Sequence, residues 1–260
     1  TQSVLGTGEL VFSGTTPFAR IYSTNANSGE VLTLDSGITV RGTVGGELGL
    51  TARGLNIKGT VIANAGTLSI SGLNWVNDGV MRAAGGVLSL NNTWSSTANG
   101  AFDVQSGTLQ LAGSFKTTDL NLGTKFTRGG GSVTITGLLD NSNDTLVLDG
   151  TTGAFNLSSQ NGVGTVRGGT VSGVGANTLG VLGSQQGNLE GVTLASDFTV
   201  TNGALVTVTN GLSLSNNAKV NVNSINNTTD LRFTGTQSVL GTGELVFSGT
   251  TPFARIYSTN

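Results

Sequence analysis

The sequence contains no cysteine and no histidine among its 260 residues. Without cysteine the chain forms no disulfide and no thiolate, and without histidine it lacks the side chain most often used in acid–base catalysis near neutral pH. The two absences together exclude the usual zinc sites, which depend on cysteine and histidine ligands. We therefore expect no bound metal, no cofactor and no catalytic residue.

Charged residues are also scarce, at 10% of the chain, whereas roughly 25% is usual in soluble proteins. The 12 basic and 14 acidic residues are scattered singly and leave a net charge of -2. No basic stripe is present to contact phosphates, so nucleic acid is excluded as a partner. No apolar run approaches the roughly 20 residues that cross a bilayer as a helix, so we expect no membrane insertion.

One stretch of the chain occurs twice without a single difference. Residues 1–25 (TQSVLGTGELVFSGTTPFARIYSTN) return as residues 236–260, an offset of 235 residues. We interpret residues 1–235 as one complete repeat and residues 236–260 as the start of the next identical repeat. No Pro-rich, Ser-rich or charged linker separates them. A tandem array of this kind is typical of a structural protein rather than of an enzyme.

Short β-strands are the dominant local signal. Glycine is frequent (42 residues) and proline rare (2 residues), and no long 3.6-residue apolar stripe is present. The recurring unit is a pair of apolar residues around one small or polar residue, as in Leu68-Ser69-Ile70 and Leu88-Ser89-Leu90. Alternation places the apolar pair on one face and the middle residue on the other. Accordingly, Leu88→Asp is predicted to be disruptive and Ser89→Asp nearly neutral.

The spacing of these units predicts the architecture. Successive units are about 21 residues apart on average, and eleven intervals between them fill the 235-residue repeat. The twelve units begin at Leu10, Leu32, Leu48, Leu68, Leu88, Leu109, Val133, Phe155, Leu179, Phe198, Val220 and Leu245. Many intervals contain a second strand-like unit, with Gly and Asn at corners where left-handed backbone is needed. This pattern predicts an all-β parallel β-helix (β-solenoid) of about eleven coils. An antiparallel sandwich is the alternative, because Asn-Gly hairpin signals also occur.

The repeated pattern resembles bacterial surface proteins of the filamentous-haemagglutinin and autotransporter-passenger type, and giant repetitive extracellular proteins. The resemblance is carried by GTLSISG (66–72), GVLSLNN (86–92), GTLQLAG (107–113) and the long passage 188–222. It covers most of the chain but includes no diagnostic motif. It implies a right-handed parallel β-helix, export to the cell surface, and structural or adhesive work. It implies no functional residues that can be transferred to this chain.

The acidic cluster in LLDNSNDTLVLDG contains Asp140, Asp144 and Asp149. Three interpretations stand for it: a calcium loop, a glycoside-cleaving pair of carboxylates, or a solvated corner between strands. An EF-hand loop is excluded, because Thr145 occupies the position that needs glycine and Thr151 the position that needs glutamate. We expect a solvated corner.

Two other features have a functional and a structural interpretation. The run Gly129-Gly130-Gly131 suggests a phosphate cradle, but no Lys-Ser/Thr pair follows it, and a corner is the expected role. Trp75 and Trp94 are about one coil apart. They would form either a sugar-binding platform on adjacent coils or part of the core, and we expect the core.

The sequence alone supports three functions. The first is a structural module of an extracellular or cell-surface fibre, whose partners are copies of itself, stacked head to tail and bundled side by side. The second is an adhesin that binds surface glycans. The third, disfavoured by the lack of paired carboxylates, is a polysaccharide-degrading enzyme.

Overall fold

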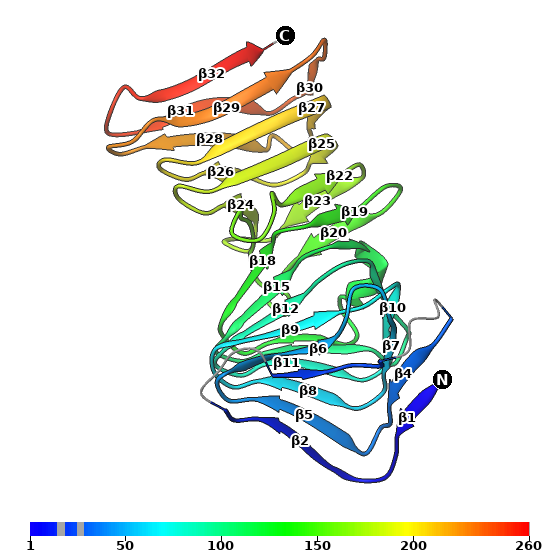
Figure 1. Cartoon of the computed structure of the whole chain (residues 1–260). Coiled ribbons are helices and arrows are strands. Elements are labelled where there is room, and N and C mark those ends of the chain that lie inside the picture. Colours follow the sequence, from blue (N-terminus) through cyan, green and yellow to red (C-terminus); the bar gives the residue numbers. More distant parts are fainter. Residues whose placement is uncertain (15–18, 25–28, 260) are drawn as a thin grey trace. The chain divides into compact units, whose positions relative to one another are not determined.

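The computed structural model of the protein describes residues 1–14, 19–24 and 29–259. Regular structure in these ranges is β-strand, apart from one 3-10 helix, η1 (Thr117–Leu120). The chain divides into two compact units, Thr1–Val133 and Thr134–Asn260. Within each unit, strands stack in parallel on the strands of the neighbouring coils (Figure 1). Each unit is therefore a parallel β-solenoid, as the sequence predicts.

In the first unit every complete coil contributes one strand to each of three sheets. The first sheet contains β1 (Gln2–Val4), β4 (Val31–Leu34), β7 (Gly54–Ile57), β10 (Trp75–Asn77) and β13 (Trp94–Ser96). The second contains β2 (Gly8–Phe12), β5 (Ile38–Gly42), β8 (Thr60–Ala63), β11 (Val80–Ala83), β14 (Ala101–Val104) and β17 (Phe126–Arg128). The third contains β3 (Arg20–Ile21), β6 (Gly45–Gly49), β9 (Thr67–Ser71), β12 (Val87–Leu90), β15 (Thr108–Leu111) and β18 (Ser132–Ile135). The boundary between the two units falls within β18. A further strand, β16 (Ser114–Lys116), directly precedes η1.

The coils of the second unit also form three rows of stacked strands. The first row contains β19 (Leu138–Asp140), β22 (Thr165–Arg167), the first halves of β25 (Gln186–Leu194) and β27 (Leu205–Leu214), β29 (Thr229–Thr234) and β32 (Ala254–Thr259). The second contains β20 (Thr145–Leu148), β23 (Thr170–Gly173), the second halves of β25 and β27, and β30 (Val239–Gly241). The third contains β21 (Phe155–Leu157), β24 (Leu179–Val181), β26 (Phe198–Val200), β28 (Lys219–Ser224) and β31 (Glu244–Gly249).

Inward-facing side chains form continuous apolar columns through the coils. Val61, Met81, Phe102 and Phe126 are consecutive partners in register and are at most 1% exposed. Full burial of such a side chain contributes about 1.5–3 kcal/mol. Because each coil can bury its column only against its neighbours, stability comes from stacking and not from any single coil.

The predicted ladder of apolar units is confirmed over much of the chain. Leu68, Leu88 and Leu109 are in register in the first unit. In the second unit Phe155 is in register with Leu179, and Phe198, Val220 and Leu245 follow one another in register. The alternative antiparallel sandwich is wrong, because the strand pairs with a described register are parallel and the antiparallel contact Val174–Asn177 is an isolated bridge.

The beginning of the ladder is wrong. Leu10 pairs with Val40, and Leu32 lies in β4, whereas Leu48 lies in β6 of the same coil and pairs with Ile21 and Ile70. The short interval from Leu32 to Leu48 is a step between two sheets of one coil and not a coil of its own. The structure accordingly has about 10 turns with a spacing of about 23 residues, in place of eleven coils of about 21. Periodicity in one dimension does not distinguish a second strand of one coil from the first strand of the next.

The predicted exposure of Ser89 is also wrong. Ser89 is 2% exposed, lies between Ser69 and Gln110 in the register, and donates its hydroxyl to Asn91 Oδ1 at 3.2 Å. Gln110 is itself only 8% exposed. A charge at position 89 would therefore be buried between neighbouring rungs, and Ser89→Asp is expected to destabilise the protein. Leu88, at 0% exposure, is buried as predicted.

Asparagine and glycine occupy the corners, as the sequence predicts. Among the described non-glycine residues with positive φ, all but Ser184 are asparagine: Asn74, Asn92, Asn121, Asn143, Asn210, Asn216 and Asn217. A left-handed backbone costs most residues about 1–2 kcal/mol, and asparagine tolerates it through local hydrogen bonds. Corners also stack on one another, which makes some glycines indispensable. At Gly113, with φ of 71°, a Cβ atom would lie 1.6 Å from the carbonyl oxygen of Asn92.

We predict that Gly113→Ala lowers the free energy of unfolding by several kcal/mol, because it adds a backbone collision to left-handed strain. Gly123→Ala is the matched control: Gly123 has φ of 74°, but a Cβ atom added there would meet nothing within 4 Å. Its cost should be limited to about 1–2 kcal/mol of left-handed strain. Chemical unfolding followed by circular dichroism measures both, and equal losses would contradict the close stacking of corners.

Candidate functional site

The second copy of the duplicated segment forms the last strands of the second unit. Within residues 236–259, β30 pairs with β27, β31 with β28 and β32 with β29. Figure 1 shows β32, in red, as the outermost layer of this unit. The junction between residues 235 and 236 falls between β29 and β30, which both pair with β27. The start of the second copy thus continues the stack of coils.

This last coil leaves large apolar side chains open to solvent. Leu240 is 64% exposed, Phe247 62% and Phe253 50%. A hollow of about 530 Å³ at this edge is lined by Phe247, Ala254, Arg255, Ile256 and Tyr257. No strand in the described part of the chain pairs with the outer side of β31 or β32. Open strand edges of this kind are places where further β-structure adds.

Phe247 has a covered counterpart where the segment occurs first. Phe12, the counterpart of Phe247, is 5% exposed. Its ring lies over Gly46 of β6, where a Cβ atom would be only 2.6 Å from the ring. An identical side chain is thus buried in one copy and exposed in the other, because a following coil is present in only one case.

Nearly half of the charged residues lie in ion pairs that link neighbouring coils. Five ion pairs join residues that are directly opposite in the register, namely Arg20–Glu47 at 2.5 Å, Arg82–Asp103 at 2.8 Å, Arg167–Glu190 at 2.8 Å, Lys219–Glu244 at 2.9 Å and Arg255–Asp230 at 2.7 Å. A sixth joins Glu9 and Arg41. Sequence reasoning described the charges as scattered and missed these pairs. Their signal was opposite charge at a separation of one coil, which is visible only once the coil lengths are known.

The three aspartates of the acidic cluster act as local acceptors at the ends of strands. Asp144 and Asp149 flank β20, and five residue steps along an extended strand separate them by about 16 Å. Asp144 Oδ1 accepts from the backbone of Thr145 at 2.7 Å, and Asp140 Oδ1 from Ser142 at 3.2 Å. The backbone N–H groups of Thr152 and Thr151, each donating at 2.9 Å, hold the pKa of Asp149 below its ordinary value. Among the described residues no group of three or more acidic side chains is placed to hold a metal ion.

We predict that a chelator does not change the thermal unfolding of the protein. The motivation is that each of these carboxylates accepts a hydrogen bond from the backbone near it, and that no group of three or more of them is placed to hold a metal ion among the described residues. Melting is measured by circular dichroism with and without EDTA, with added calcium as a third condition. A melting temperature that falls with EDTA and recovers with calcium would establish a calcium site.

The two tryptophans belong to the core, so the sugar-platform interpretation is wrong. Trp75 and Trp94 are 0% and 2% exposed and stack with ring centroids 5.8 Å apart. Trp94 also stacks on Phe115 at 4.6 Å. Each indole N–H is satisfied inside the coil, donating to the carbonyls of Asn91 at 2.8 Å and Ala112 at 3.1 Å.

The run Gly129-Gly130-Gly131 forms a corner after β17. Gly131 has φ of 61°, and a Cβ there would lie 2.3 Å from the carbonyl of Gly107. The guanidinium of Arg128 donates to the carbonyls of Gly130 at 3.2 Å and Gly131 at 2.9 Å. The carbonyls of this corner are therefore turned toward a cation of the chain itself, which does not suit a phosphate cradle.

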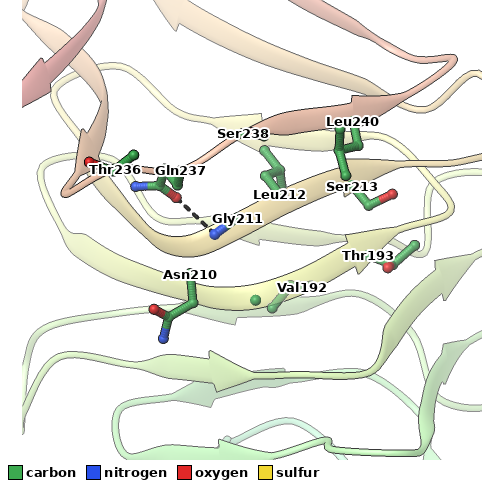
Figure 2. A pocket seen from close by; sticks show the side chains of 11 residues that line it. Val192, Thr193, Asn210, Gly211, Leu212, Ser213, Thr236, Gln237, Ser238 and Leu240 are labelled. Atoms are coloured by element: carbon green, nitrogen blue, oxygen red, sulfur yellow. Dashed lines mark hydrogen bonds between the residues drawn. The ribbon is translucent and has the colours of Figure 1, made fainter.

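A shallow groove of about 450 Å³ lies along β25, β27 and β30 (Figure 2). Its walls include the polar side chains of Thr193, Asn210, Ser213, Gln237 and Ser238. Gln237 is engaged at both ends, accepting from the Gly211 N–H at 3.0 Å and donating to the carbonyls of Val208 and Thr234 at 2.8 Å. None of the described residues that line the groove is titratable, so it offers neither a general acid nor a general base.

These features define the chain as a parallel β-solenoid whose last coil has an exposed apolar edge. No family model, no curated protein and no solved structure matches it. In the described part of the chain no helix is long and apolar enough to cross a membrane.

Proposed function

We propose that this chain is a structural module of an extracellular or cell-surface fibre built from tandem identical β-solenoid repeats. The observation that supports this most strongly is the second copy of residues 1–25. It forms the final coil of the second unit and presents Phe247 at 62% exposure where its counterpart Phe12 is 5% exposed. A solenoid that ended here would leave an apolar edge open to uncontrolled pairing, whereas a following repeat covers it.

The surface suits a fibre that also associates side by side. Outward positions are mainly Thr, Ser, Asn and Gly, and charges make up 10% of the chain with a net value of -2. Self-repulsion between neighbouring rods is therefore weak. The pairing of charges between coils reduces it further.

Electron microscopy of chains containing one, two and four repeats tests the proposal. We expect thin, unbranched rods whose length increases in proportion to the number of repeats, with layering near the ~4.8 Å spacing of adjacent strands. Globular beads joined by flexible connections would contradict it. Localisation is tested separately, by labelling intact cells with an antibody against the repeat.

Glycan binding is a second candidate, supported by the neutral groove in Figure 2 with its hydroxyl and amide side chains. Many identical repeats would add avidity to a weak contact. A glycan array tests this, and binding that is lost in Thr193→Val would place the ligand in the groove. We propose no catalytic activity, and release of reducing sugar from mixed polysaccharides would contradict that.

A further inference from the structure

The duplicated segment is seen in contact with coils on both of its sides, one side in each copy. In the first copy Leu10 pairs with Val40 and Ile21 with Leu48, both later in the chain. In the second copy the counterparts Leu245 and Ile256 pair with Val220 and Leu231, both earlier in the chain. The third strand behaves likewise, with Val4 opposite Leu34 and Val239 opposite Leu212. The two sets of partners use opposite edges of the same strands and do not compete.

The charges of the segment fit both neighbours. Glutamate and arginine at positions 9 and 20 are its only charged residues. The glutamate pairs with Arg41 in the first copy and, as Glu244, with Lys219 at 2.9 Å in the second. The arginine pairs with Glu47 at 2.5 Å in the first copy and, as Arg255, with Asp230 at 2.7 Å in the second. Superposing the copies gives the ladders Lys219–Glu–Arg41 and Asp230–Arg–Glu47, in which the signs alternate throughout.

The glycines of the duplicated segment also have close neighbours in one copy and open space in the other. Gly6 has φ of 92° and Gly8 has φ of 159°, and a Cβ at either position would meet nothing within 4 Å. At their counterparts Gly241 and Gly243 a Cβ would lie 1.9 Å from the carbonyl of Leu214 and 2.1 Å from that of Ala218. Glycine is therefore needed at these positions because the backbone of the preceding repeat lies too close for a Cβ atom. The need for Gly46, against the ring of Phe12, is explained by the segment itself.

We propose that the exposed edge of β30, β31 and β32 binds residues 31–49 of the following copy of this repeat, in the register that the first copy shows. Val246 then faces Arg41 of the following repeat, and Phe247 is covered by Gly46 of that repeat. The two charge ladders and the Phe–Gly contact oppose slippage, because a shift of one residue would turn the apolar side chains outward. This inference rests on the proposed stacking of tandem repeats and specifies how the repeats join.

A chain of two consecutive repeats (residues 1–235 followed by 1–260) tests the inference, and the absence of native cysteine makes single thiols usable as probes. In Phe247→Cys, alkylation should be at least about tenfold slower in the two-repeat chain than in the 260-residue chain, since the site passes from open to covered. Val174→Cys, at a position 65% exposed, is the control and should react at the same rate in both chains.

Disulfide formation tests the register. Cysteines at Val246 and at Arg41 of the following repeat should cross-link, because directly opposed Cα atoms lie within the ~4.4–6.8 Å that a disulfide requires. Cysteines at Val246 and at Thr43 of the following repeat should not. If position 247 is protected but only the second pair cross-links, the register is overturned while tandem stacking stands. If position 247 stays reactive and neither pair cross-links, the repeats do not stack, and the proposed function fails as well.

Discussion

Leu146→Asp is expected to lower the free energy of unfolding of the second unit by several kcal/mol. Leu146 is 0% exposed on β20 and stands opposite Val171, itself 1% exposed. A carboxylate at this position would be buried without a partner, and an unpaired buried charge is among the most destabilising changes in a core. Denaturant unfolding followed by circular dichroism measures the loss.

Val147→Asp is the matched control, one residue further along the same strand. Val147 is 43% exposed and lies opposite Ser172, so a carboxylate there remains in water. We expect a change within about 0.5 kcal/mol, as for most surface substitutions. A similar loss from both substitutions would contradict the inward and outward alternation on which the solenoid depends.

Trp94→Ala is expected to have the second largest effect, about 3–5 kcal/mol, as for other large buried aromatic residues. Trp94 is 2% exposed and lies between Trp75 and Phe115, with ring centroids at 5.8 Å and 4.6 Å. Its removal opens a cavity and leaves the carbonyl of Ala112 without the indole donor, which is 3.1 Å away in the intact protein. Trp94→Phe keeps most of the stacking and should cost clearly less.

Val174→Ala serves as the control for loss of an apolar side chain. Val174 is 65% exposed, so its truncation should change stability by less than about 0.5 kcal/mol. If Trp94→Ala were equally mild, the tryptophans would not be part of the core, and a role for them in binding would have to be considered again.

Much of the fold was predictable because stacking imposes a simple rule on the chain. Each coil repeats the same in-and-out alternation, so the apolar units at Leu68, Leu88 and Leu109 could be aligned by spacing alone. Asparagine at the corners was predictable for the same reason, since a tight turn recurs at each coil and few residues accept left-handed backbone. The assignment failed between Leu10 and Leu48, because Leu10, Leu32 and Leu48 lie in three different sheets. Spacing there does not reveal which sheet a strand joins.

Residues 1–25 show most clearly what the sequence determined by itself. The identity of residues 236–260 with residues 1–25 is read directly from the sequence, and the alternation of apolar residues in both copies predicts that they form β-structure. Both conclusions follow from local pattern, which needs no knowledge of neighbours. The absence of histidine and cysteine excluded whole classes of site in the same direct way.

Only the tertiary structure decided which residues face one another. The pairing of Glu244 with Lys219 and of Glu9 with Arg41 depends on coil lengths that differ from turn to turn. The burial of Ser89, the core position of Trp94 and the opposite exposures of Phe12 and Phe247 depend on what lies one coil away. In a solenoid the alternation along a strand is a local property of the chain. Contact and burial are properties of the stack, because the atoms that cover a side chain come from residues about one coil distant.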